Sequence, residues 1–479
     1  MSGEVPGKKI GILVVAYNAA STLASVLDRI PPAFRSRVSE ILVSDDHSQD
    51  ATYLVGLGYQ QLSELPITVI RQPQNLGYGG NQKAGYQLAI ERGFDIIVLL
   101  HGDGQYAPEC LPEMVAPLER GECDAVFGSR MMIKGAARRG GMPLYKFVGN
   151  RILSTFENAA LGTDLTEFHS GYRAYSVKAL QDIPFEKNSD GFNFDTQIII
   201  QMHDAGMLIR EIPIPTYYGD EICYVQGMRY ARDVVTDVAR YRLQKAGFGD
   251  GESVALSDEY ELKESPDSSH GRIFSFLASR PPSKILDLGC SGGQLAERLQ
   301  RAGHDVTGVD LVEVPGVHDR ITNFVKSDLD EGIPPEVGSG FDIVLAADVL
   351  EHVRNPQRLL RDAKSALGPG GRLILCVPNI GHWYPRFRTL LGRFDYDQRG
   401  ILDRTHLRFF TRRSIEKLVQ REGLSVVRRE PIGLPLDVIS GGESQTKLGI
   451  VRRLDHLLLA AWPTMFGYQF LIEAEPAAG

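Results

Sequence analysis

Short runs of apolar and β-branched residues alternate with longer stretches of helical periodicity through the first half of the chain. These runs cover residues 10–15, 40–44, 67–70, 96–100 and 125–127. Strands that are buried on both faces of a sheet read as continuous apolar runs, and the helices between them cover the two faces. The pattern predicts a parallel sheet with helices on both sides.

A change in composition separates this region from a second region of the same kind. Residues 247–269 are rich in Gly, Ser, Asp and Glu, which is typical of a linker because such residues bury little apolar surface. Further buried strands are predicted at residues 285–288, 306–309, 343–346 and 373–377. The predicted fold class is α/β, with two doubly wound domains over residues 1–246 and 270–479.

The bulk composition narrows the classes of protein to consider. A length of 479 residues suits two domains, and a net charge of -8 argues against a general nucleic-acid binder. The five cysteines form no CxxC pair, so neither a disulfide framework nor a zinc site is predicted. No apolar run reaches the ~20 residues of a membrane-spanning helix. We expect a cytoplasmic protein, and peripheral association with the inner face of the cell membrane is compatible with this expectation.

Candidate ligand-binding residues follow the first two predicted strands. Ala16, Tyr17 and Asn18 come after the first strand, and Asp45 and Asp46 come after the second. Open α/β sheets bind ligands at the carboxyl ends of their strands. An aromatic ring can stack on a base, and a carboxylate can accept hydrogen bonds from a base or from ribose hydroxyls. Asp-rich turns are also common without a ligand.

The fourth predicted strand ends in a turn with candidate metal ligands. It runs through His101, Gly102, Asp103, Gly104 and Gln105. A diphosphate leaving group needs a divalent cation to neutralise its charge, and hard cations prefer carboxylate and amide oxygens. Asp103 and Gln105 could supply such oxygens. Taken alone, the turn also fits a Gly-rich hairpin without a metal.

The order of these segments resembles family 2 glycosyltransferases of the GT-A fold, and especially their dolichyl-phosphate mannosyltransferase-like branch. The resemblance covers about residues 9–243 and includes residues 75–81, 128–130 and 169–173. It implies that the residues after the first two strands hold the nucleoside of a nucleotide sugar. It also implies Mg²⁺ or Mn²⁺ on Asp103, assisted by Gln105. The chain departs from the family at His101, which replaces the first Asp of the DxD motif and could itself bind Mn²⁺.

Three further residues are candidates for the sugar-transfer site. Arg130 and Arg173 could grip phosphate oxygens, because a planar guanidinium binds phosphate in a bidentate manner. The alternative is a solvated surface pair. Enzymes of this family invert the anomeric carbon, and a hydroxyl acceptor needs a base, for which Asp195 is the candidate by position. A lipid-phosphate acceptor is already anionic and needs no base, and Asp195 would then only cap a helix.

The second half contains a strand that runs into a Gly-rich turn and then into a helix. Asp287 lies in the strand, and Gly289, Cys290 and Gly292 form the turn. Such a turn lets a ligand approach the backbone closely, but alone it does not separate a dinucleotide site from an S-adenosylmethionine (SAM) site. Later acidic residues decide between them. These are Asp310, placed for a ribose diol, Asp328, placed for an adenine amino group, and Asp348.

This ordered set resembles class I SAM-dependent methyltransferases, especially the ubiquinone-biosynthesis-like branch, over about residues 270–479. The resemblance implies a Rossmann-like domain that binds SAM and has its closing strand at residues 468–474. Methyl transfer is a direct displacement that alignment alone can accelerate, so a general base is optional. His352 and His406 are candidate bases, with a helix-start or core role as the alternative. Residues 380–404 are expected to form a lid over the methyl acceptor.

The sequence as a whole favours a bifunctional transferase. We expect transfer of a sugar from a nucleotide sugar to a lipid-phosphate or glycan acceptor, and of a methyl group from SAM to a glycan or related molecule, in cell-surface polysaccharide or glycolipid synthesis. The alternative is a SAM-dependent methyltransferase with a catalytically weak, nucleotide-sugar-binding scaffold domain. Two dehydrogenase-like domains are disfavoured by the motifs of the second half.

Overall fold

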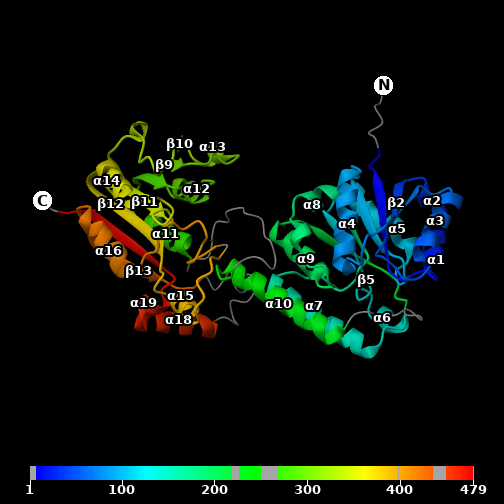
Figure 1. Cartoon of the computed structure of the whole chain (residues 1–479). Helices are drawn as coiled ribbons and strands as arrows, with labels where there is room; N and C mark the ends of the chain where they lie inside the picture. Colours follow the sequence, from blue (N-terminus) through cyan, green and yellow to red (C-terminus); the bar gives the residue numbers. More distant parts are fainter. Residues whose placement is uncertain (1–6, 218–225, 250–267, 398, 435–448, 478–479) are drawn as a thin grey trace, which may run out of the picture. The chain divides into compact units, whose positions relative to one another are not determined.

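The computed structural model describes residues 7–217, 226–249, 268–397, 399–434 and 449–477. They form two compact units, one made of residues 7–217 and 226–241 and the other of the remaining described residues from Arg242 onward (Figure 1). Each unit holds a seven-stranded sheet, so the predicted fold of two doubly wound α/β domains is confirmed. Within the described residues, no helix is both long enough and apolar enough to span a membrane.

The sheet of the first unit has the strand order β3-β2-β1-β4-β6-β5-β7. Its strands are β1 (Ile10–Ala16), β2 (Val38–Asp45), β3 (Ile67–Arg71), β4 (Ile96–His101), β5 (Ala125–Ser129), β6 (Arg173–Ser176) and β7 (Ile209–Pro213). β6 runs antiparallel to both of its neighbours, β4 and β5, and the other pairs are parallel. The carboxyl ends of β1, β2, β4 and β5 therefore lie at one edge of the sheet.

The helices of the first unit cover both faces of this sheet (Figure 1). They are α1 (Leu23–Asp28), α2 (Pro32–Arg35), α3 (Thr52–Leu62), α4 (Gly77–Glu91), α5 (Leu111–Glu119), α6 (Ala136–Arg139), α7 (Leu144–Leu161), α8 (Val177–Gln181), α9 (Phe194–Asp204) and α10 (Gly227–Lys245), with short 3-10 turns η1 (Pro108–Cys110) and η2 (Phe185–Lys187). Successive residues of a strand point to opposite faces. Leu13 accordingly joins one buried cluster, while Ile12 and Val14 join another.

The sheet of the second unit has the order β10-β9-β8-β11-β12-β14-β13. Its strands are β8 (Lys284–Leu288), β9 (Asp305–Asp310), β10 (Asn323–Lys326), β11 (Phe341–Ala347), β12 (Leu367–Pro378), β13 (Leu424–Ile432) and β14 (Gln469–Pro476). β14 is antiparallel to both β12 and β13, and the other pairs are parallel. Ile285 and Leu286 enter separate buried clusters, so this sheet also has two packed faces.

The helices of the second unit connect these strands. They are α11 (Ser269–Ala278), α12 (Gln294–Arg301), α13 (Val317–Arg320), α14 (Pro356–Ala366), α15 (Trp383–Leu390), α16 (Arg412–Arg421), α18 (Gly449–Ala461) and α19 (Pro463–Phe466), with a 3-10 turn η3 (Pro335–Val337). Helix α12 follows β8 directly after the Gly-rich turn, as the sequence predicts.

The two ends of the predicted linker, residues 247–269, are packed. Phe248 is 8% exposed and lies edge-on to Tyr384 and Tyr468. Ser268 begins helix α11 by accepting a hydrogen bond from the Gly271 amide. Residues 250–267, the rest of the predicted linker, lie outside the described residues. Phe248 therefore belongs to the second unit, although the polar composition around it predicts a linker. The reason is that its large aromatic side chain is buried.

Candidate functional sites

The predicted nucleotide-sugar residues meet at the carboxyl edge of the first sheet. Ala16 is the register partner of Asp45 on β2, and Val15 is the partner of His101 on β4. Tyr17 is half-buried and Asn18 is exposed at the same edge. Asn18 has a left-handed φ of 50° and its side-chain oxygen accepts from the Gln49 amide, which fixes this turn against the next loop. Asn tolerates this conformation better than most residues.

The two adjacent aspartates of this edge are both engaged with protein groups. Asp46 accepts hydrogen bonds from the backbone amides of Leu76 at 2.7 Å and Gly77 at 3.1 Å, where helix α4 begins. Burial raises the pKa of Asp46. The side chain of Asp45 is fully buried and lies 3.6 Å from the Arg71 guanidinium. These carboxylates hold the edge in shape, and a nucleoside would share them with those partners.

Asp103 and Gln105 lie in one tight turn after β4. Asp103 is exposed and its Oδ1 accepts from the Gln105 amide at 3.0 Å, while Gly104 between them has a left-handed φ of 78°. A carboxylate has about four acceptor sites, so this bond leaves most of its capacity available. An exposed carboxylate beside an amide side chain is a donor set that fits Mg²⁺ or Mn²⁺.

His101 turns towards the interior of the first unit. Its ring lies edge-on to those of Tyr78 and Tyr106, and its Nε2 atom is buried without a hydrogen-bond partner among the described residues. Burial lowers the pKa of His101, so the ring stays neutral. A Cβ at Gly171 would lie 2.7 Å from this ring, so the glycine provides the space for it. His101 therefore packs as a neutral group where the family pattern has a carboxylate.

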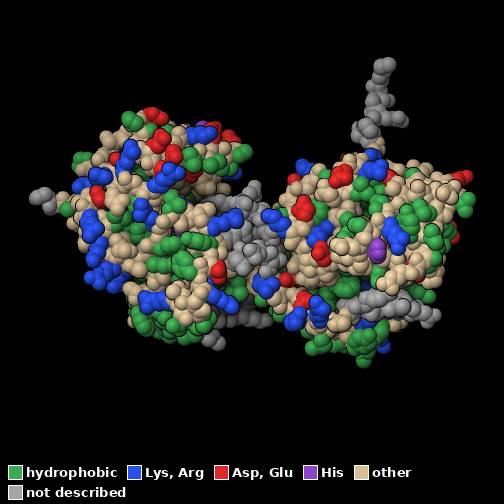
Figure 2. All heavy atoms as spheres, in the orientation of Figure 1, with side chains coloured by type: hydrophobic (Ala, Val, Ile, Leu, Met, Phe, Trp, Pro, Cys, Tyr) green, Lys and Arg blue, Asp and Glu red, His purple; other side chains and the backbone are tan. Residues whose placement is uncertain are grey.

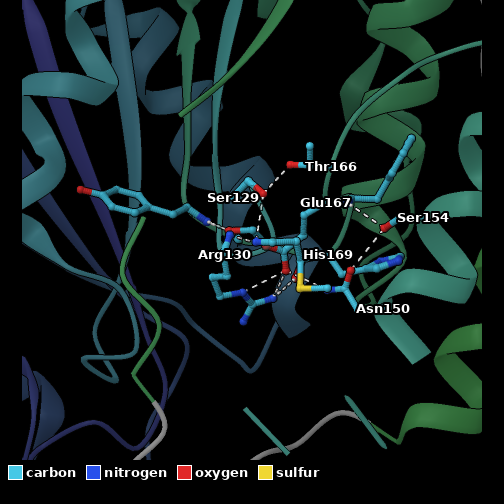
Figure 3. A network of polar contacts seen from close by, with 12 residues as sticks. Ser129, Arg130, Asn150, Ser154, Thr166, Glu167 and His169 are labelled. Carbon is cyan, nitrogen blue, oxygen red and sulfur yellow. Dashed lines mark hydrogen bonds and ion pairs between the residues drawn. The ribbon is translucent and has the colours of Figure 1, made fainter. Parts of the chain in front are cut away.

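Arg130 forms a buried ion pair, not a solvated surface pair. Its backbone amide and Nε both donate to Glu167, and the Asn150 amide donates to the same carboxylate at 2.8 Å (Figure 3). Burial opposes ionisation of Glu167, but the adjacent guanidinium outweighs it and lowers the pKa of Glu167. Figure 3 shows Ser129, Thr166 and Ser154 around this pair. Arg130 is thus held rigidly at the carboxyl end of β5.

Arg173 does not suit the phosphate contact predicted for it. The side chain is fully buried, and its guanidinium donates to the carbonyl oxygens of Phe168, Ser170 and Asp195 at 2.8–3.0 Å. It also lies 4.6 Å from the centre of the Phe127 ring. A cation with this many internal partners and no exposed surface cannot reach a ligand. Its role is to hold the loop before β6 against the start of α9.

Asp195 lies in the first turn of α9 and is 5% exposed. Its carboxylate accepts from the Tyr78 hydroxyl at 2.9 Å and lies 3.6 Å from the Arg173 guanidinium. The N-cap position belongs to Asn193, and no side-chain capping bond is present at this helix start. Asp195 therefore belongs to a buried cluster beside His101 and does not cap the helix.

The predicted SAM residues also meet at one sheet edge, after the adjacent strands β10, β9, β8 and β11. In the Gly-rich turn, Gly289 has a φ of 72°, and a Cβ there would lie 2.6 Å from Val349. The Asp310 carboxylate accepts from the Ser291 amide at 2.7 Å and from the Val312 amide at 3.0 Å. Asp310 therefore fixes the turn and keeps acceptor capacity for a further ligand.

The other predicted residues of this edge differ in exposure. Cys290 is 7% exposed, and burial raises the pKa of its thiol well above the ordinary value. Gly292 lies in the same turn. Asp328 accepts from the Asp330 amide, and Asp348 has a left-handed φ of 56° and accepts from the Gln469 side chain at 2.6 Å. A strained φ at a non-glycine residue is typical of functional loops.

Asp287 is buried next to Asp310, and this raises its pKa from 3.8 to about 7, chiefly through burial and then through the Asp310 charge. Such a group favours the folded state while protonated, so its stabilising contribution is complete below pH 3.8 and is lost as the pH rises towards 7. We expect the free energy of unfolding of the second unit to fall over this range by about 1 kcal/mol per pH unit. Asp287→Asn should remove this slope.

Tryptophan fluorescence during urea unfolding measures this effect in the whole chain, because both tryptophans, Trp383 and Trp462, lie in the second unit. Asp305→Asn, at the exposed start of β9, is the matched control and should leave the slope as it is. If the free energy of unfolding changes with pH equally in Asp287→Asn and in the original chain, the raised pKa of Asp287 is contradicted.

His352 and His406 lie together beyond β11. Their ring centres are 4.8 Å apart, and Glu351 offers a carboxylate oxygen within 4.8 Å of a ring nitrogen from each. Burial and the neighbouring His352 lower the pKa of His406 to about 4. The Thr405 hydroxyl lies 3.3 Å from His352 Nδ1 and donates to Asp403. Two adjacent imidazole rings of this kind can accept a proton or hold a metal ion.

The predicted lid, residues 380–404, contains helix α15 and borders a cavity. The cavity has a volume of about 390 Å³ and is lined by Ile380, Pro385, Arg386, Thr389, Leu390 and Phe394. Tyr384 and Arg388 both bond to the buried carboxylate of Asp397, which ties α15 to the following loop. That this segment covers a methyl acceptor stays a prediction.

Several residues that shape the two sites were missed from the sequence. Glu167 holds Arg130, Glu157 lies 3.1 Å from His169, and Gln469 holds Asp348. Each is remote in sequence from its partner. Tyr78 and Glu167 do lie within or beside segments that carry the family resemblance, and this was the available signal. Gln469 lies on the closing strand and had no such signal.

Family comparisons agree with the division into two units. Residues 11–184 match the family "Glycosyl transferase family 2". Residues 264–429 match the family "Methyltransferase domain". Each match falls within the residue range of one of the two units.

Several curated proteins are similar to the first unit. A UDP-N-acetylglucosamine–dolichyl-phosphate N-acetylglucosaminyltransferase of Methanococcus voltae is 29% identical over 44% of this chain and 86% of that protein. An undecaprenyl-phosphate mannosyltransferase of Micrococcus luteus is 29% identical over 42% of this chain and 81% of its own length.

The second unit is similar to a ubiquinone biosynthesis O-methyltransferase of Caulobacter sp., which is 36% identical over 20% of this chain and 41% of that protein.

A solved structure of glucosyl-3-phosphoglycerate synthase from Mycobacterium tuberculosis with UDP is 21% identical, over 49% of this chain and 80% of that one, with a TM-score of 0.39. That structural similarity is too distant to bear on function. The chain thus joins a family 2 glycosyltransferase domain to a methyltransferase domain, each with the fold predicted for it.

Proposed function

We propose that the protein is a bifunctional transferase that acts on a lipid-linked glycan. The glycosyltransferase domain moves a sugar from a nucleotide sugar to a polyprenyl phosphate, and the methyltransferase domain moves a methyl group from SAM to a glycan or related acceptor. The observation that carries the first activity is the exposed Asp103 turn beside the edge that holds Tyr17, Asn18 and Asp45. Relatives named for dolichyl-phosphate and undecaprenyl-phosphate transfer support a lipid-phosphate acceptor.

The residues of the first site have separate roles in this proposal. Asp103 and Gln105 would hold Mg²⁺ or Mn²⁺, which supplies positive charge to the leaving diphosphate. The nucleoside would lie between Tyr17, Asn18 and Asp45. Arg130 lies at the end of β5 and supplies a fixed positive charge. An anionic phosphate acceptor attacks the anomeric carbon without losing a proton. This fits the buried state of Asp195, which already accepts from Tyr78.

The acidic edge of the second sheet would bind SAM, which supplies an electrophilic methyl group. Asp310 accepts from the ribose hydroxyls while it keeps the Gly-rich turn in place. Asp328 lies after β10 and Asp348 lies after β11, and both would bind the rest of the cofactor. If the acceptor is a hydroxyl, His352 takes its proton, because Thr405 holds the ring by its other nitrogen. We place both reactions in the cytoplasm, in synthesis of a cell-surface polysaccharide or glycolipid.

The test is a screen of nucleotide sugars with polyprenyl phosphate and Mn²⁺, using the full chain and product detection by mass spectrometry. The expected result is a glycosylated lipid phosphate, formed only with the metal. The alternative is a methyltransferase whose first domain is a weak nucleotide-sugar-binding scaffold, and His101 in place of a carboxylate favours it. Nucleotide-sugar binding without turnover, with methyl transfer to a glycan retained, would select that alternative.

A further inference from the structure

Helix α7 has its polar and apolar faces reversed relative to an ordinary surface helix. Its buried side chains include Asn150, Ser154 and Glu157. They are needed inside, because Asn150 donates to the Arg130 partner Glu167, and Glu157 accepts from Thr196 and lies 3.1 Å from His169. A helix on a soluble protein normally turns its apolar side towards the core.

The outward face of α7 carries a stripe of large apolar side chains. Leu144, Val148, Ile152 and Phe156 follow one another at intervals of four residues, and their exposed fractions are 62%, 45%, 64% and 37%. Tyr145 beside them is 73% exposed. In a helix, residues four apart lie on the same face. Figure 2 shows hydrophobic side chains gathered over α6 and α7.

The segment that leads into α7 continues this surface. Met132 and Ile133 are 44% and 53% exposed, and Lys134, Arg138 and Arg139 near them are also exposed. Contiguous exposed apolar side chains of this kind mark a surface that contacts a partner or a membrane.

The charge of this segment singles out the partner. Residues 131–156 contain five Lys and Arg residues and no Asp or Glu, although the whole chain carries a net charge of -8. The cations are Lys134, Arg138, Arg139, Lys146 and Arg151. Apolar side chains flanked by Lys and Arg are the pattern of helices that lie in the interface of an anionic bilayer.

We propose that α7 and the segment before it, residues 131–156, form a surface that docks the glycosyltransferase domain on an anionic lipid bilayer. The inference rests on the proposed function, since a polyprenyl phosphate is embedded in a bilayer. The segment starts directly after Arg130, so the surface that contacts lipid is continuous in the chain with the sugar-transfer site. Its inner face fixes Arg130 through Asn150 and Glu167, and its outer face contacts the membrane.

The test is co-sedimentation of the full chain with vesicles of phosphatidylglycerol and phosphatidylcholine. The original chain should bind these vesicles more tightly than phosphatidylcholine vesicles, and added salt should weaken the binding. Val148→Gln with Ile152→Gln should weaken it by roughly tenfold or more, since two large apolar side chains no longer enter the bilayer. The matched control is Leu54→Gln with Leu62→Gln on α3, where both leucines are exposed and no basic run accompanies them. That control should bind as the original chain does.

The outcomes separate this surface from the proposed function. If the original chain does not bind anionic vesicles, or if the α7 variant binds them equally well, the proposed docking surface is overturned. Sugar transfer to polyprenyl phosphate dispersed in detergent tests the proposed function separately. Vesicle binding without any sugar transfer would support the surface and count against the function. Analytical ultracentrifugation without lipid compares the masses of the original chain and the α7 variant. If the original chain is a dimer and the variant a monomer, a second copy covers this face, and the proposal is overturned.

Discussion

Asp103→Asn is expected to reduce sugar transfer by at least about a hundredfold while SAM binding stays unchanged. The substitution keeps the size of the side chain but removes the negative charge that would hold the cation. A metal ion on a transferring phosphoryl or diphosphate group is worth several kcal/mol of charge stabilisation, and about 2.7 kcal/mol corresponds to a hundredfold in rate. Because Asp103 is exposed in a turn, the substitution should leave the fold intact.

The measurement is the initial rate of glycolipid formation at a series of Mn²⁺ concentrations. Glu64→Gln, an exposed acid in the same domain, is the matched control and should behave as the original chain. Partial recovery of the Asp103→Asn variant at high Mn²⁺ would support a role in metal binding. An unaltered rate would remove Asp103 from the site, and parallel loss of SAM binding would indicate misfolding.

Asp310→Ala is expected to weaken SAM binding by about ten- to a hundredfold. A charge-assisted hydrogen bond of this type contributes about 1.5–3 kcal/mol, and ~1.4 kcal/mol corresponds to tenfold in affinity. The structure gives a second reason in the same direction, because Asp310 also holds the Ser291 amide of the Gly-rich turn.

Calorimetric titration of the full chain with SAM, S-adenosylhomocysteine and NAD tests this prediction. The two SAM-related ligands should bind and NAD should not. Asp305→Ala lies at the opposite end of the same strand, β9, and is the matched control. Binding of NAD in place of SAM would contradict the proposed cofactor for the second domain.

The fold could be predicted well because the buried strands of two largely parallel sheets read as apolar runs in the sequence. Residues 10–15 read as an apolar run and residues 285–288 read as one apart from Asp287, and they form β1 and β8 with one residue added at an end. The positions of the candidate sites follow from the same rule, since strand ends can be located from apolar runs. The mixed order of the first sheet, with β6 inserted antiparallel between β4 and β5, could not be read this way because it depends on long-range pairing.

The burial and the hydrogen-bond partners of individual side chains were much harder to predict. Arg173 starts β6, a central strand with both faces buried, so its side chain is buried although a charged residue is usually exposed. Its carbonyl partners come from a loop and from α9, neither of which has a sequence signal for this contact. Arg130 directly follows β5, but its partner Glu167 lies 37 residues away in the sequence. Composition also missed the burial of Phe248.

The raised pKa of the Cys290 thiol has a consequence for chemical self-protection. A thiolate is a strong nucleophile, whereas a protonated thiol is weak. Cys290 lies in the turn proposed to hold a sulfonium that alkylates nucleophiles. Burial, and to a lesser extent the neighbouring carboxyl groups of Asp287 and Asp310, raises the pKa of this thiol and disfavours the thiolate. In the proposed complex with SAM, the protonated thiol would therefore be a poor methyl acceptor, which would protect this loop from methylation.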